Sequence, residues 1–130
     1  MVLANYPKAL RICSKADFDL LFKKGKGFTV FPIKLSYLKS DNHPSQQPFL
    51  FAATAPKRLF KRAVDRNRIK RQLKESIRKN KHLLLANTNL NSPNQTNLLL
   101  FTYIAAEKSS SEVIENATIK LINRLIQSNE

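Results

Sequence analysis

The 130-residue chain has one cysteine, two glycines and no tryptophan. Because Cys13 has no second cysteine to pair with, an intrachain disulfide is excluded. One cysteine and two distant histidines, His43 and His82, favour neither a zinc site nor a cysteine–histidine nucleophile. Gly25 and Gly27 are too few for a glycine-rich phosphate-binding loop. The sequence therefore favours a protein that binds a partner and has no catalytic site of its own.

Acidic residues are also scarce, since 9 Asp and Glu oppose 23 Lys and Arg, giving a net charge of +14 and a pI near 10.3. This excess implies a strongly anionic partner, with nucleic acid favoured over an anionic membrane surface. No apolar run approaches the length of a membrane span, and the first residues lack the pattern of a signal peptide. We expect a cytoplasmic, single-domain protein over residues 1–130, with no membrane partner and no obligate protein partner.

The positive charge is concentrated in residues 57–81, which hold twelve of the 23 Lys and Arg and only two acids, Asp65 and Glu75. An ordinary solvated helix face mixes Glu and Lys, which support one another at i,i+4 spacing. Here nearly all the charge has one sign, and repulsion among the cations costs stability unless a polyanion offsets it. We therefore interpret this segment as a nucleic-acid contact.

The same segment has the period of an amphipathic helix. At about 100° per residue, Ile69, Leu73 and Ile77 fall on one narrow stripe, with Ser76 beside it. Asp65 is expected to be the N-cap or a first-turn acid. The other side carries polar and cationic residues, namely Asn67, Arg68, Lys70, Arg71, Lys74, Arg78, Lys79 and Lys81. The pattern predicts a helix that docks on a core and offers its other side to an anion.

The remaining elements predict an α+β sandwich, with helices packed on a small sheet. In chain order we expect a flexible arm (1–8), a helix of about ten residues after Ser14, strands over 28–30 and 33–39, a loop (40–48), a strand (49–55), the basic helix, a loop (87–97), a strand (98–105) and a helix capped by Ser111. Gly25 is expected to form a left-handed helix cap. Strands 33–39 and 49–55 are expected to pair antiparallel, with Ile33, Leu35 and Tyr37 on the face opposite Lys34, Ser36 and Leu38.

Residues 66–71, Arg-Asn-Arg-Ile-Lys-Arg, resemble the RNR signature of the bacterial ribonuclease P protein component. The helix with Asp17, Phe18, Phe22 and Gly25 resembles the first helix of the same family, and the resemblance covers roughly residues 9–126. It implies an αβββαβα fold with a small mixed sheet. It also implies a left-handed βαβ crossover from the 49–55 strand to the 98–105 strand, against the usual right-handed rule.

The resemblance implies a protein subunit of ribonuclease P, which binds the catalytic RNA and the 5′ leader of precursor tRNA and assists endonucleolytic removal of the leader. The RNA would perform the Mg²⁺-dependent hydrolysis, so the protein is expected to have no catalytic residue, metal or cofactor. By position, the resemblance places against the catalytic RNA Lys57, Arg58, Arg66, Asn67, Arg68, Lys70, Arg71, Lys74 and Arg78. It places in the leader cleft, between the first helix and the sheet, Phe18, Phe22 and either Ser36 or Tyr37. Without the resemblance, Phe18 and Phe22 would be read first as core residues.

Other functions also fit the charge. A ribosomal or assembly-type protein would bind structured RNA without a role in cleavage, and a free-standing nuclease would cleave without an RNA partner. A DNA-binding protein would use residues 65–81 as a recognition helix, but no paired helix with a tight turn precedes them. All would lose affinity steeply with salt. Leader affinity and cleavage assays are therefore needed to choose among them.

Overall fold

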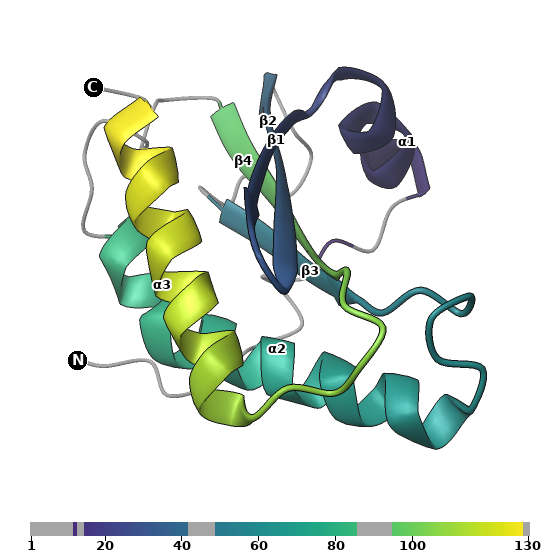
Figure 1. The fold of residues 1–130 in the computed structure, drawn as a ribbon. Helices are drawn as coiled ribbons and strands as arrows, with labels where there is room; N and C mark the ends of the chain where they lie inside the picture. The colour runs from purple at the N-terminus through teal and green to yellow at the C-terminus, as the bar shows by residue number, and fades with distance from the viewer. Residues whose placement is uncertain (1–11, 13–14, 42–48, 86–94, 129–130) are drawn as a thin grey trace.

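The computed structural model describes residues 12, 15–41, 49–85 and 95–128 (Figure 1). The elements are α1 (Lys15–Lys24), β1 (Lys26–Val30), β2 (Ile33–Asp41), β3 (Phe49–Thr54), α2 (Ala63–Leu85), β4 (Gln95–Tyr103) and α3 (Ser111–Ser128). This order confirms the predicted αβββαβα fold. The predicted arm (1–8) and the cap Ser14 lie outside the described residues. The predicted loops are too long, because residues 40–41 belong to β2 and residues 95–97 belong to β4.

The four strands form one mixed sheet in the order β1-β2-β4-β3. β2 pairs antiparallel with β1 and, on its other side, with β4. β3 pairs parallel with β4, with Phe49 opposite Asn97 and Thr54 opposite Thr102. The predicted antiparallel pairing of strands 33–39 and 49–55 is therefore wrong, because β4 lies between them. β3, α2 and β4 form the predicted βαβ unit, and the handedness of its crossover remains a prediction.

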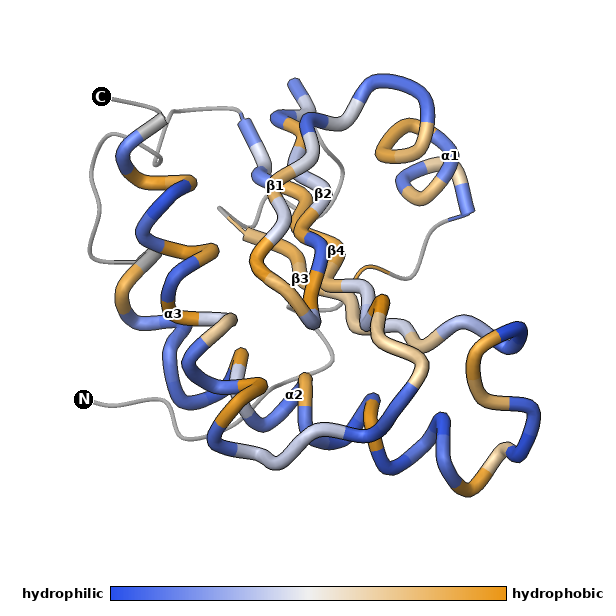
Figure 2. The backbone as a smooth tube through the Cα atoms, viewed as in Figure 1, coloured by the Kyte–Doolittle hydropathy of each residue, from blue (hydrophilic) through white to orange (hydrophobic). Residues whose placement is uncertain are grey.

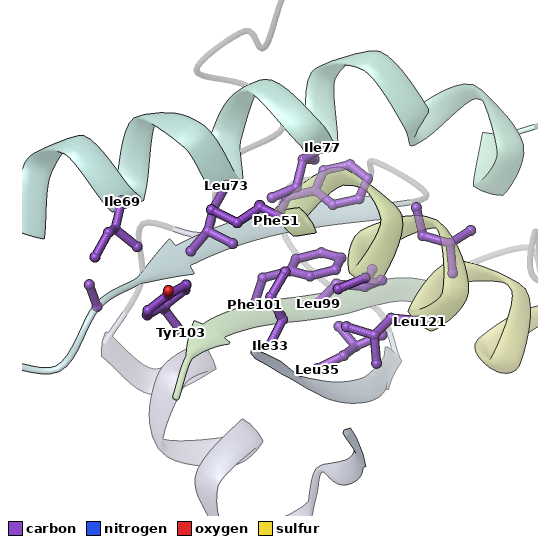
Figure 3. Packing of buried hydrophobic residues seen from close by; sticks show 14 of the residues in the cluster. Ile33, Leu35, Phe51, Ile69, Leu73, Ile77, Leu99, Phe101, Tyr103 and Leu121 are labelled. Atoms are coloured by element: carbon purple, nitrogen blue, oxygen red, sulfur yellow. The ribbon is translucent and has the colours of Figure 1, made fainter. Parts of the chain in front are cut away.

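One face of the sheet packs against α2 and α3 and forms the main core (Figure 3). From α2, the predicted stripe of Ile69, Leu73 and Ile77 points at the sheet and is almost fully buried. Burial of each such side chain contributes about 1.5–3 kcal/mol, so this stripe fixes which side of α2 faces outward. The strands and α3 contribute Ile33, Leu35, Tyr37, Phe49, Phe51, Leu99, Phe101, Tyr103, Ile114, Ala117, Leu121, Ile122 and Leu125.

The opposite face of the sheet packs against α1 through a smaller cluster, which contains Leu21 together with Leu50, Leu98 and Leu100. Because side chains alternate along a strand, these leucines point away from the main core. Ile12 joins the cluster, and its N–H donates to the Phe51 carbonyl oxygen at 2.9 Å. The sheet is therefore covered by α2 and α3 on one side and by α1 on the other (Figure 1).

α3 begins one residue earlier in the chain than the sequence predicted. The Ser110 hydroxyl accepts a hydrogen bond from the Val113 N–H at 3.3 Å, so Ser110 is the N-cap and the predicted cap Ser111 is the first helical residue. The sequence alone could not separate three consecutive serines, residues 109–111, because each can cap a helix.

Gly25 ends α1 without the predicted left-handed conformation, since no glycine in the described residues has a positive φ. Its N–H donates to the Leu21 carbonyl oxygen at 3.0 Å, which continues the helical pattern by one residue. A Cβ atom at Gly25 would lie 2.4 Å from that same oxygen. The glycine is therefore needed for a close backbone approach.

We expect Gly25→Ala to lower the free energy of unfolding by about 1–3 kcal/mol, the usual range for a side chain forced into occupied space. The measurement is urea unfolding of both proteins. Gly27→Ala is the matched control, because a Cβ at Gly27 meets only the Lys34 Cε at 3.4 Å, an ordinary contact. Equal effects of the two substitutions would contradict the prediction.

Candidate nucleic-acid interface

Beyond the exposed Val64 in its first turn, the side of α2 that faces away from the sheet is mostly hydrophilic (Figure 2). Asn67, Arg68 and Arg71 are exposed, and Lys70 and Lys74 are half-buried. These five predicted contact residues therefore lie together on the outer side of one helix, and the core stripe fixes their orientation.

Lys81 is an exception, because the sequence placed it on this outer side and the structure buries it to 2% exposure. It follows Ile77 by four residues and so continues the buried row, next to buried Ser76 and Asn80. Burial, with a smaller contribution from repulsion by Arg78, lowers the pKa of the Lys81 ammonium. Lys81 is thus removed from the outer cationic surface.

The turn between β3 and α2 adds further cations. Lys57 and Arg58 are exposed in this turn. The turn is held by hydrogen bonds from the N–H groups of Leu59 and Phe60 to the Pro56 carbonyl oxygen. Phe60 anchors the turn, because its buried ring packs against Tyr103 with 5.8 Å between the ring centroids. The basic turn is therefore attached to the main core.

Lys61 and Arg62 are also exposed in the approach to α2, although neither was among the predicted contact residues. The signal for them was present in the sequence, as two more cations between the Lys57–Arg58 pair and the RNR segment. Together with the outer residues of α2 they extend the cationic surface toward the sheet.

Arg66 has a structural contact that the sequence did not indicate. Its Nη1 donates to the carbonyl oxygens of Phe60 and Lys61, each at 2.9 Å. The first arginine of the RNR segment therefore closes the turn that precedes α2. It also holds that turn against the helix start.

The two acids of the basic segment are both ion-paired. Asp65 Oδ1 lies 2.7 Å from Lys108 Nζ, and Glu75 accepts hydrogen bonds from the Arg78 guanidinium. The hydrogen bond from Lys108, aided by its charge and those of Arg62 and Arg68, lowers the pKa of Asp65. The hydrogen bond from Arg78, aided by its charge and that of Lys79, lowers the pKa of Glu75.

These lowered pKa values predict an acid-sensitive contribution to stability. Because both carboxyl groups release their protons more readily in the folded state, they stabilise it at pH values above their ordinary pKa of about 4, and this stabilisation is lost as the pH falls through the lowered values. We expect the urea midpoint of the wild type to fall more between pH 6 and pH 2.5 than that of the Asp65→Asn/Glu75→Gln protein. An equal fall of the urea midpoint in both proteins would show that neither ion pair contributes measurably to stability.

The α1 face of the sheet is covered at one end and open at the other. Under α1, the row Leu38–Leu98–Leu50 is apolar and packs beneath Leu21 and Phe18. Phe18 is half-buried against this cluster, whereas Phe22, one helical turn later, is 72% exposed. The two aromatics therefore differ, since Phe18 supports the core and Phe22 presents its ring to solvent.

The structure distinguishes Ser36 from Tyr37. Tyr37 points to the α2–α3 side, is buried in the main core, and its hydroxyl donates to Asn97 Oδ1 at 2.8 Å. Ser36 has the opposite orientation and is half-buried on the α1 side. Tyr37 therefore faces the α2–α3 side of the sheet, and Ser36 is the one of the two residues that lies on the α1 side, where the leader cleft is predicted.

Beyond Ser36, the open end of this face carries a polar row across all four strands. The register places Thr29 opposite Lys34, Lys34 opposite Thr102, and Thr102 opposite Thr54. Lys34 is exposed, and its side chain reaches over Gly27. Alternation in the sequence predicted that Lys34 shares a face with Ser36. The threonines could not be found that way, because their alignment depends on the pairing of strands.

Two further observations bear on the chemistry of the surface. Within the part of the chain that the structure describes, no group of three or more His, Cys, Asp or Glu side chains is arranged to hold a metal ion. The helices of the same part are all too short or too polar to cross a bilayer.

Comparison with known proteins identifies the family. Residues 6–126 match the model of the Ribonuclease P family. The ribonuclease P protein component of Porphyromonas gingivalis is 31% identical over 118 residues, covering 91% of this chain and 84% of the relative. That of Xylella fastidiosa is 31% identical over 74 residues, covering 57% of this chain and 51% of the relative.

Solved structures agree in fold. A mutant of the Staphylococcus aureus RNase P protein superimposes with a TM-score of 0.65 at 23% identity, covering 91% of this chain and 89% of that one. The RNase P protein of Thermotoga maritima gives 0.62 at 18% identity, covering 88% and 96%. The basic outer side of α2, the α+β fold and the match over residues 6–126 lead to one conclusion: the chain belongs to the ribonuclease P protein family, the protein subunits of the ribonucleoprotein endoribonuclease ribonuclease P.

Proposed function

We propose that the chain binds the catalytic RNA of ribonuclease P through the outer side of α2 and the turn before it. The observation that carries this proposal is the one-sided distribution of charge. The core stripe turns Arg68 and Arg71 outward, and the exposed cations of residues 57–62 continue the same surface. A surface of this kind suits a phosphate backbone, because arginine forms paired, charge-assisted hydrogen bonds with phosphate oxygens.

We propose further that the 5′ leader of precursor tRNA lies on the α1 face. Phe22 offers an exposed ring on which an unpaired base can stack, and Lys34 offers a cation for the backbone. Ser36 and the threonines aligned with Lys34, which are Thr29, Thr102 and Thr54, add hydroxyl groups that can form hydrogen bonds with a sugar–phosphate chain. The two RNA surfaces then lie on opposite sides of the sheet, so one protein can hold the catalytic RNA and the leader at once.

In this proposal hydrolysis belongs to the RNA, with Mg²⁺ as its metal, and the protein contributes affinity and cleavage-site fidelity. The test is cleavage of a 5′-labelled precursor tRNA at low Mg²⁺ with the catalytic RNA alone, the protein alone and both together. We expect efficient cleavage at the mature 5′ end only from the combination. A protein that adds nothing to the RNA would favour a ribosomal or assembly-type role, and cleavage by the protein alone would contradict the assignment of catalysis to the RNA.

A further inference from the structure

The connection between β4 and α3, residues 104–110, is fixed to the main core near the start of α2. The Tyr103 hydroxyl bonds to the Glu107 carbonyl oxygen and lies 2.7 Å from Ser109 Oγ. The ring of Tyr103 is fully buried and packs on Phe60. Glu107 and Ser109, the two neighbours of Lys108 in the chain, are therefore both hydrogen-bonded to buried Tyr103, and this fixes the position of the Lys108 backbone.

The same connection is bonded to α2. Gln72 Nε2 donates to Ser111 Oγ at 3.2 Å and to the Ser109 carbonyl oxygen at 3.5 Å. Lys108 completes the attachment, because its Nζ lies 2.7 Å from Asp65 Oδ1. The carboxylate side chain is only 20% exposed, whereas Lys108 is 42% exposed.

The position of Asp65 is unfavourable for the binding of a polyanion. It lies in the first turn of α2, three residues after Arg62 and three residues before Arg68, so its carboxylate stands among the exposed cations. A bare carboxylate at this place would repel the phosphates that the cations attract. Lys108 comes from a segment distant in the sequence and meets the carboxylate directly.

We infer that Lys108 is a positioning residue for RNA binding, which holds and neutralises the Asp65 carboxylate so that the surface around α2 is uniformly positive toward the phosphate backbone. This inference rests on the proposed contact between α2 and the catalytic RNA. It differs from a direct role of Lys108 in binding phosphate, because its effect on RNA affinity exists only while Asp65 carries a charge.

The test is a double-mutant cycle, with affinity for the catalytic RNA of ribonuclease P measured by filter binding at several salt concentrations. We expect Lys108→Met to weaken binding about three- to tenfold, the size of one uncompensated charge several ångströms from a phosphate. Asp65→Asn should bind as tightly as the wild type or more tightly. Lys108→Met in the Asp65→Asn background should remain within about twofold of Asp65→Asn alone, because no carboxylate is left to neutralise.

Three controls make the outcome decisive. Lys108→Arg keeps the ion pair and should bind like the wild type, and Lys120→Met, an equal loss of charge on α3, should have little effect. Thermal unfolding checks that each variant is folded, and Lys108→Gln replaces Lys108→Met in both backgrounds if Lys108→Met alone is unstable. An equal loss from Lys108→Met in both backgrounds, or no loss in either, would overturn the inference. Normal binding by an Arg68→Ala protein would instead overturn the proposed contact of α2 with RNA, whatever the cycle shows.

Discussion

Replacement of Arg68 and Arg71 together by alanine is expected to weaken binding of the catalytic RNA more than a hundredfold. Both side chains are exposed on the outer side of α2, where the buried stripe of Ile69 and Leu73 fixes their direction. A hydrogen bond to a charged group contributes about 1.5–3 kcal/mol, so the loss of two arginine–phosphate contacts removes about 3 kcal/mol or more. Stability should change by less than about 0.5 kcal/mol per site, as is usual for surface residues.

The measurement is a binding isotherm over a range of salt concentrations. Each phosphate contact that is lost should lower the slope of log affinity against log salt by about 0.9. Lys120→Glu is the matched control, because this single change on α3 lowers the net charge by the same two units as the double substitution. If Lys120→Glu weakened binding as much, net charge alone would account for the effect and the specific role of α2 would be refuted.

The sequence predicted α2 well because helical periodicity is local. Ile69, Leu73 and Ile77 repeat at four-residue spacing, and this spacing alone determines which residues face the core. Its failure at Lys81 has a physical reason, since α2 packs on α3 as well as on the sheet, and its buried side is wider than the apolar stripe. A lysine can enter such a border because its long apolar stem tolerates burial.

Pairing of strands was the part that sequence alone could not determine. The 33–39 and 49–55 strands are neighbours in the chain, and neighbouring strands usually pair, but β4 takes the place between them and is buried along most of its length. The polar row from Thr29 to Thr54 and the Asp65–Lys108 pair depend on this arrangement. Both bring together residues that are distant in the sequence, so no local sequence pattern could predict them.

The side-chain directions on β2 show what period-two alternation in the sequence can and cannot predict. Period-two alternation correctly placed Ser36 and Tyr37 on opposite sides, yet it could not say which side would face α1. That choice depends on which helices cover which face, and the main core takes the side with Ile33, Leu35 and Tyr37. Ser36 is left on the α1 side as a consequence of how the core is filled.

Phe22→Ala is expected to weaken binding of the precursor tRNA leader by about 1–3 kcal/mol, the usual contribution of one stacked base. The assembled ribonucleoprotein should bind precursor tRNA about 5- to 150-fold less tightly, while its affinity for mature tRNA, which has no leader, should not change. The free energy of unfolding should also be nearly unchanged, because the ring is 72% exposed and contributes little to the core. This combination separates a binding role from a packing role.

The chain offers a matched control in Phe31, an equally exposed phenylalanine at 70%, which lies in the turn between β1 and β2 and not on α1. Phe31→Ala removes the same apolar surface and should leave leader affinity unchanged. If both substitutions weakened precursor binding equally, exposed apolar area in general would be responsible, and a specific stacking site on α1 would be refuted. If Phe22→Ala changed only the stability, its ring would belong to the packing around Leu21, and the leader would have to be held by the Ser36 and Lys34 side of the sheet alone.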